Sequence, residues 1–176
     1  DSIEKYFTRL YTRNNPYFFF TIFAQLFMKI WRNISEFDAR NPVITIGIFD
    51  GVHRGHQFLI EELKNQAVQR KGESVVLTLW PHPRIVLNKD PGNLRYLTTI
   101  EEKAYLLEKE GIDHFVIIPF TKEFSKLSSC DFVEEYLVKK LKIKKLIVGF
   151  NHKFGRNREG DYQNLKDCAK RFSFEL

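Results

Sequence analysis

The chain is poor in cysteine and has no apolar run of membrane-spanning length. Its two cysteines, Cys130 and Cys168, lie far apart and form no Cys-x-x-Cys pair. This spacing argues against a zinc-finger type of metal site and against a disulfide-rich secreted scaffold. The dense aromatic run at residues 17–27 is shorter than the roughly 20 apolar residues of a spanning helix. We therefore interpret the chain as a cytoplasmic protein with two reduced thiols and no membrane contact.

Long runs of like charge are also absent, although Lys and Arg outnumber Asp and Glu and give a formal net charge of +6. Scattered basic residues are typical of a solvated surface and not of a nucleic-acid-binding arm. A positive balance still suits a polyanionic ligand, and nucleotides, nucleic acid and anionic lipid all remain candidates. Two common phosphate motifs, Walker A and Gly-x-Gly-x-x-Gly, do not occur.

The length of 176 residues suits one domain with a sizeable core. Residues 1–27 differ in character from the remainder, and Met28 is the only methionine of the chain. We therefore expect a non-native or upstream extension at 1–27, followed by a domain at 28–176. An amphipathic anchor helix is the alternative for the first segment.

From Met28 onward, strand and helix patterns alternate along the chain. The expected strands are 43–49, 74–80, 114–119 and 145–148, and a further one begins at 172–176. The expected helices are 56–70, 98–111, 128–141 and 161–171. Helical crossovers between strands give a mostly parallel sheet with helices on both faces, which is an α/β fold.

Local signals support these helices. Phe58, Leu59, Leu63 and Ala67 are expected to form the apolar face of the first one. Gly72 stands where a left-handed C-cap glycine would end that helix. Residues 98–102, Thr-Thr-Ile-Glu-Glu, contain a capping box for the second helix.

The most informative segment is 43–56, Val-Ile-Thr-Ile-Gly-Ile-Phe-Asp-Gly-Val-His-Arg-Gly-His. An apolar run ends in a glycine-containing turn with two histidines, His53 and His56, and a helical pattern follows. Backbone N–H groups and the positive end of a helix dipole make such a turn a phosphate site. Gly55 lets the backbone approach closely, and the imidazoles can donate to phosphate oxygens that gain charge during a reaction. Two surface histidines at a helix start are the plainer alternative.

Two further segments are expected at the same edge of the sheet, because ligands gather at the carboxyl ends of parallel strands. In residues 81–83, Pro-His-Pro, the prolines fix the backbone around His82, although a rigid loop exit is the alternative. Residues 149–158 mix amide, imidazole, cationic and aromatic side chains. This mixture suits a phosphorylated aromatic ligand, and a basic surface loop is the alternative.

Together these motifs resemble those of the bacterial FAD synthetases, the bifunctional riboflavin kinase/FMN adenylyltransferases. The resemblance rests on residues 45–56, 81–83, 119–128 (beginning Pro-Phe-Thr-Lys-Glu-Phe and ending Leu-Ser) and 148–161. It runs from about Met28 to the end of the chain. His-x-Gly-His alone would fit any nucleotidylyltransferase or class I aminoacyl-tRNA synthetase, whereas the ordered motifs are specific.

The resemblance implies a Rossmann-like nucleotidylyltransferase fold that transfers AMP from ATP to FMN with Mg²⁺, giving FAD and pyrophosphate. ATP and FMN are then the small-molecule substrates, and neither nucleic acid nor membrane is expected as a partner. It also implies that His53 and His56 are catalytic, and it assigns no direct metal ligand. The implied ATP-binding residues are Gly47, Phe49, Asp50, Gly51, His53, Gly55 and His56. The implied flavin-binding residues are His82, Pro83, Asn151 and Phe154.

The chain departs from the family pattern in three ways. Trp80 stands where the family usually has Phe, and Asn151 stands where many members carry Asp. The chain also ends at Leu176, before the family's Ser-Ser-Thr-x-Ile-Arg-like segment and its riboflavin kinase domain. We therefore expect weak or absent FAD formation from these 176 residues, and riboflavin phosphorylation only from the full-length protein.

Two alternative functions stay open. The first is an adenylyl- or cytidylyltransferase for another phosphorylated acceptor, such as pantetheine phosphate or nicotinate mononucleotide. The second is a non-catalytic nucleotide- or RNA-binding module that uses the net charge of +6. The sequence does not indicate an oligomeric state.

Overall fold

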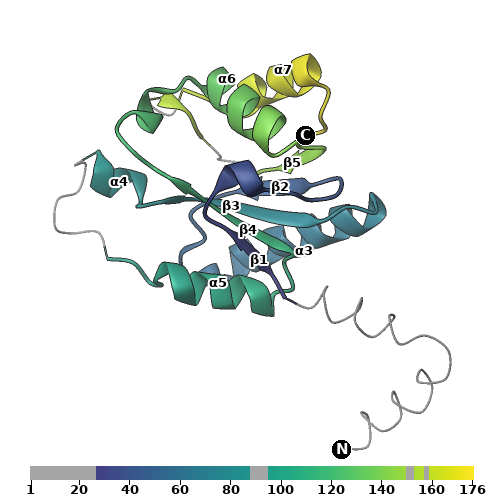
Figure 1. Ribbon diagram of the computed structural model, residues 1–176, viewed down its shortest axis with the longest axis vertical. Helices are drawn as coiled ribbons and strands as arrows, with labels where there is room; N and C mark the ends of the chain where they lie inside the picture. Colours follow the sequence, from purple (N-terminus) through teal and green to yellow (C-terminus); the bar gives the residue numbers. More distant parts are fainter. Residues whose placement is uncertain (1–26, 88–94, 150–152, 157–158) are drawn as a thin grey trace, which may run out of the picture.

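The described residues form a parallel sheet of five strands (Figure 1). The structure is a computed structural model, and it describes residues 27–87, 95–149, 153–156 and 159–176. The strands are β1 (Lys29–Trp31), β2 (Val43–Ile46), β3 (Ser74–Trp80), β4 (His114–Pro119) and β5 (Lys145–Ile147). They lie in the order β1-β4-β3-β2-β5, and each neighbouring pair is parallel. The predicted α/β fold is confirmed.

Helices cover both faces of this sheet, as the alternation predicts (Figure 1). One face carries α3 (Arg54–Gln69) and α5 (Ile100–Lys109). The other carries α6 (Ser129–Phe132), its π-helical continuation η4 (Val133–Lys140) and α7 (Tyr162–Phe172). The shorter elements are α4 (Pro83–Val86) and the 3-10 turns η1 (Ile34–Glu36), η2 (Asp50–Val52) and η3 (Phe124–Lys126). The predicted capping box of α5 is present, with Thr99 and Glu102 each bonding the other's backbone N–H.

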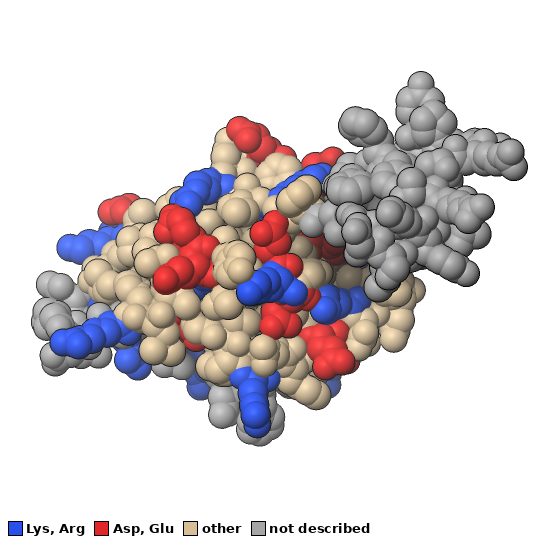
Figure 2. Space-filling model, turned by 90° about the horizontal axis from the view of Figure 1, so that it is seen from below, with Lys and Arg blue, Asp and Glu red and all other residues tan. Residues whose placement is uncertain are grey.

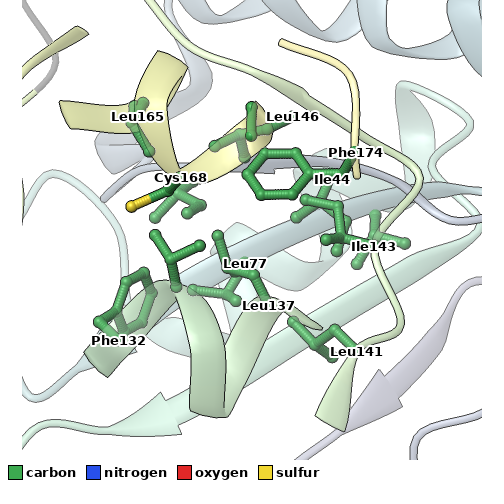
Figure 3. Packing of buried hydrophobic residues seen from close by; sticks show 14 of the residues in the cluster. Ile44, Leu77, Phe132, Leu137, Leu141, Ile143, Leu146, Leu165, Cys168 and Phe174 are labelled. Carbon is green, nitrogen blue, oxygen red and sulfur yellow. The ribbon is translucent and has the colours of Figure 1, made fainter. Parts of the chain in front are cut away.

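Strand β2 is buried along its whole length, because β3 and β5 flank it and helices cover both of its faces. Its side chains alternate between the two faces. Val43 packs in the cluster under α3 and α5, and Ile44 packs in the cluster under α6, η4 and α7. Figure 3 shows this second cluster, where Ile44 and Leu77 of the sheet lie near Leu137 and Leu165. Burial on both faces explains the continuous β-branched run of this strand.

The structure corrects the expected strands at three places. β2 ends at Ile46, because the chain turns into left-handed conformations from Phe49 onward. The strand expected at the chain end is a single bridge between Glu175 and Lys145, since α7 continues to Phe172. The structure also adds β1, a short strand that pairs with β4 and that no alternation in the sequence marks.

The first helix also differs from its expected form. α3 begins at Arg54, two residues earlier than predicted. Its buried residues are Ile60, Leu63 and Ala67, which repeat every three to four positions. Phe58 was expected on this face but is 76% exposed, because a residue two positions before Ile60 points to the opposite side of the helix.

The residue with a left-handed backbone conformation after α3 is Lys71, with a φ of 49°, and not Gly72 as predicted. The glycine is needed for a different reason. A Cβ atom at Gly72 would lie 2.2 Å from the backbone oxygen of Asn41. The close approach of two chain segments therefore requires a glycine at this position.

The expected extension at residues 1–27 stays a prediction, because residues 1–26 lie outside the described part. β1 begins at Lys29, so the described sheet starts where the domain was expected to start. No helix in the described ranges is both long enough and apolar enough to cross a membrane.

We predict that Gly72→Ala lowers the free energy of unfolding by about 1–3 kcal/mol, the usual cost of overpacking. The added methyl group would collide with a backbone oxygen, which no side-chain rotation relieves. Gly149→Ala is the matched control, because nothing lies within 4 Å of its Cβ position. Its effect should stay within about 0.5 kcal/mol. Urea unfolding measures the difference, and equal stability of the two variants would contradict the crowding at Gly72.

Candidate functional site

The carboxyl ends of β3, β2 and β5 lie side by side at one edge of the sheet, because these strands are parallel neighbours. The chain runs from β2 to β3 and β4 on one side, and it then crosses to β5 on the other side of β2. Such a reversal opens a crevice where α/β proteins bind ligands. The described parts of the three segments 47–56, 81–83 and 149–158 follow these strands at this edge.

The turn after β2 winds through left-handed backbone conformations. Phe49, Gly51 and Val52 have φ angles of 50°, 74° and 40°. The Phe49 ring is buried, and a Cβ atom on Gly47 would lie 2.7 Å from its Cε2 atom. Gly47 is therefore needed for the ring to fold back beneath the turn.

The two histidines of this turn stack on one another at the N-terminus of α3. His53 is the N-cap residue, and its side chain makes no capping hydrogen bond. The ring centroids of His53 and His56 are 3.8 Å apart, with 19° between their planes. A Cβ atom at Gly55 would lie 3.3 Å from His53 Cε1, so the glycine leaves room for this stack. Since the first N–H groups of a helix have no partner within it, the turn offers imidazole and backbone donors together.

His56 is uncharged at neutral pH in the ligand-free protein. Burial lowers the pKa of His56 to about 4, and the charges of His53 and Lys103 contribute to this shift. The Asp50 carboxylate has a smaller, opposing effect. Its Nδ1 atom is buried and has no hydrogen-bond partner among the described residues. A bound anion would favour the protonated ring, which then has two donors.

Asp50 ties the turn to the start of α5. Its carboxylate accepts hydrogen bonds from the backbone N–H groups of Leu97 and Thr98 and from the Thr98 hydroxyl, at 3.0–3.1 Å. The same hydroxyl accepts a bond from the Gly51 N–H at 3.2 Å. Burial alone would raise the pKa of Asp50, but these bonds and the Lys103 charge outweigh it and lower the pKa. The carboxylate is thus occupied in holding the shape of the turn.

Sequence reasoning missed Lys103, a fully buried residue of α5. Its Nζ atom lies 5.8 Å from the centroid of the Trp80 ring and has no hydrogen-bond partner among the described residues. Burial lowers the pKa of Lys103, and the Asp50 carboxylate opposes this effect. Its position in the sequence could have indicated its burial. Lys103 stands in the helical repeat between Ile100 and Leu107, which both face the core.

In the Pro-His-Pro segment, two hydrogen bonds hold His82 in place. His82 Nδ1 accepts a bond from the Arg84 N–H at 3.0 Å, where Pro83 starts α4. The His82 N–H donates to the Tyr96 hydroxyl at 3.0 Å. The Tyr96 ring lies 4.9 Å from the Trp80 ring, so an aromatic pair adjoins the histidine. The sequence did not point to Tyr96, because this contact crosses a loop.

The Lys103 charge reaches both histidine segments. Burial is the main cause that lowers the pKa of His82, and the charges of Arg84 and Lys103 add to it while Asp50 opposes. The same lysine contributes to the lowered pKa of His56. The Lys103 charge therefore acts on one histidine in each of the two segments.

Phe154 belongs to the cluster on the opposite face of the sheet, with its ring centroid 6.1 Å from that of Phe132. Its backbone exchanges two hydrogen bonds with Gly160, at 3.1 and 2.9 Å. The structure thus sets Phe154 beyond β5 on the side of α6 and α7, whereas the histidine turn lies on the side of α3. Asn151, the other predicted residue of this loop, lies outside the described residues.

Known proteins resemble this chain in sequence. Residues 35–176 match the family model described as FAD synthetase. A Listeria monocytogenes protein named bifunctional riboflavin kinase/FMN adenylyltransferase is 40% identical over 76% of this chain and 42% of its own length. An Escherichia coli protein of the same name is 34% identical over 85% of this chain and 48% of its own length. The chain spans about half the length of the curated relatives it matches.

Solved structures also resemble this chain in fold, among them a Streptococcus pneumoniae protein named macrolide-efflux protein, with a TM-score of 0.71 and 25% identity. The likeness covers 84% of this chain and 48% of that protein. Together with the family match, it supports the predicted Rossmann-like nucleotidylyltransferase fold.

We predict that His56 of the ligand-free protein titrates near pH 4 in an NMR titration, because burial lowers its pKa from 6.5 to about 4. Between these two pH values the unfolded chain binds more protons than the folded chain, so stability falls as the pH is lowered through this window. His56→Gln removes this contribution and should flatten the loss of thermal stability. Phe58→Gln, on the exposed side of the same helix, is the control. A His56 midpoint near 6.5 would contradict the partial burial of the ring.

Proposed function

Because the chain belongs to the FAD synthetase family, we propose that it transfers the adenylyl group of ATP to FMN, forming FAD and releasing pyrophosphate. The observation that carries this proposal is the stacked pair His53 and His56 at the N-terminus of α3, inside the segment that matches the family. The relatives' names combine FMN adenylyltransferase with riboflavin kinase. We propose riboflavin phosphorylation only for the full-length protein.

The reaction needs positioning and charge stabilisation more than covalent chemistry. An oxygen of the FMN phosphate attacks the α-phosphorus of ATP, and the bond from this phosphorus to the bridging oxygen of pyrophosphate breaks. Negative charge grows on the α-phosphate oxygens and then on the departing pyrophosphate. Donors that are fixed beside these oxygens stabilise the transition state more than the ground state. His53, His56 and the first N–H groups of α3 supply such donors.

We assign ATP to the turn after β2 and the flavin to the segments after β3 and β5. The residues assigned to ATP are Gly47, Phe49, Asp50, Gly51, His53, Gly55 and His56. The residues assigned to the flavin are His82, Pro83, Asn151 and Phe154. The Trp80 and Tyr96 rings support this division, because they offer an aromatic surface beside His82.

Magnesium is expected to arrive with ATP and not on a site of the protein. Within the described ranges, no group of three or more His, Cys, Asp or Glu side chains could hold a metal ion. The acidic residue of the turn, Asp50, already accepts hydrogen bonds from Leu97 and Thr98. Mg²⁺ is commonly bound through substrate phosphates and water. A magnesium ion carried by the ATP phosphates needs no such group.

An RNA-binding module fits the charge distribution less well than a small-molecule transferase. RNA-binding surfaces carry exposed Lys and Arg side chains that follow the nucleic-acid backbone. Figure 2, which views the molecule from the α5 side, shows Lys and Arg side chains lying among Asp and Glu. The cation that acts on both histidine segments, Lys103, is buried.

Product formation tests the proposal directly. We predict that the purified protein converts FMN and ATP to FAD and pyrophosphate. Liquid chromatography measures FAD, and the change in flavin fluorescence measures FMN binding. Preferred use of CTP, pantetheine phosphate or nicotinate mononucleotide would assign a different transferase activity. Salt-dependent binding of RNA without binding of ATP would indicate a non-catalytic module.

We predict that His53→Ala and His56→Ala each lower kcat by about 10²–10³, the usual loss for one preorganised donor. FMN binding should change little in both variants. Phe154→Ala should do the reverse and weaken FMN binding while ATP binding stays nearly intact. Phe58→Ala is the control, because this side chain is 76% exposed on the same helix as His56. Unchanged kcat in both histidine variants would show that the turn is only a scaffold.

A further inference from the structure

The described residues contain four buried side-chain polar atoms without a hydrogen-bond partner: Thr45 Oγ1, His56 Nδ1, Thr78 Oγ1 and Lys103 Nζ. All four belong to the α3–α5 side of the sheet. Thr45 faces this side with Val43, because strand residues two positions apart point the same way. Thr78 faces it with Val76 for the same reason. Since buried polar atoms are rarely left without partners, this concentration indicates a site for a polar ligand.

Lys103 is the most costly of these groups to bury. Its side chain is 0% exposed and has no hydrogen-bond partner among the described residues, and burying an unpaired ammonium group is strongly destabilising. The Asp50 carboxylate makes no hydrogen bond with it. Packing alone does not account for a lysine here, since a methionine of similar length would fill the same space without the charge.

The ammonium group lies close to the end of β3. It stands over the ring of Trp80, the last residue of β3, on the side assigned to the flavin. Its charge also acts on His56, in the turn assigned to ATP. Adenylyl transfer requires the acceptor phosphate and the α-phosphate of ATP to meet between these two segments.

We propose that Lys103 binds the phosphate group of FMN at the point where it attacks ATP. This inference rests on the proposed function and adds a phosphate-binding residue to it. The two phosphates repel each other, and a positive charge in a low-dielectric position offsets this repulsion more strongly than a hydrated surface lysine. The phosphate in turn gives the ammonium group an acceptor, which the described residues do not supply.

Lys103→Met tests whether the lysine serves the ligand or the fold. Removing a buried charge while keeping the chain length should leave the unfolding temperature of the ligand-free protein unchanged or raise it. Lys109→Met is the matched control, because it removes the same charge at an exposed position of α5. Lys103→Gln provides a second neutral variant with a different shape.

Riboflavin, which is FMN without its phosphate, completes the comparison. We predict that the wild-type protein and Lys109→Met bind FMN more tightly than riboflavin by roughly tenfold to a hundredfold, the range of a charge-assisted hydrogen bond. Both Lys103 variants should bind the two flavins with similar affinity. Fluorescence titrations at one fixed ionic strength measure the binding constants of FMN and of riboflavin for the wild-type protein and for each variant.

The outcomes separate this inference from the proposed function. A Lys103 variant that still prefers FMN overturns the inference, and so does a large fall in the unfolding temperature of both variants. If the wild-type protein also forms FAD in that case, the proposed function stands. A preference for FMN that depends on Lys103, without binding of ATP, supports the phosphate site and contradicts adenylyl transfer. A wild-type protein that binds neither flavin overturns both.

Discussion

The hydrogen bonds of the Asp50 carboxylate join two parts of the chain that lie 47 residues apart, the turn after β2 and the residues before α5. Bonds from backbone N–H groups to a carboxylate are among the stronger ones in proteins. The lowered pKa of Asp50 keeps the group ionised, so the link holds at neutral pH. The link fixes α5 against the turn, and this brings Lys103 within electrostatic reach of His56. The rest of the site depends on that arrangement.

Two groups that can take up positive charge lie in this part of the protein. His56 is held neutral, and burial lowers the pKa of Lys103. An arriving phosphate reverses both effects, because an adjacent anion favours the charged form of each group. The energy that the folded protein loses by burying these groups is therefore recovered on binding. A site of this kind trades stability of the ligand-free protein for affinity towards an anion.

The sequence predicted what depends on local pattern. The β-branched run of β2, the capping box at Thr99 and the glycine-rich turn are each decided by neighbouring residues, and the structure has all three. It did not predict the bond from Asp50 to Thr98 or the burial of Lys103, because both depend on which distant segments meet. Phe58 was misplaced because an apolar residue at a helix start fits more than one face. The roles of His53 and His56 stay predictions, since geometry alone does not measure them.

Neighbouring strands of the sheet end at different levels along this edge. Ile46, the last residue of β2, pairs with Leu77, and β3 continues through three more residues to Trp80. At about 3.3 Å per residue, β3 stands roughly 10 Å higher than β2. The turn with its histidine donors therefore lies low beside a wall that ends in Trp80 and His82. Because the Lys103 ammonium group lies 5.8 Å from the centroid of the Trp80 ring, the phosphate site proposed for Lys103 belongs to this wall and not to the low turn.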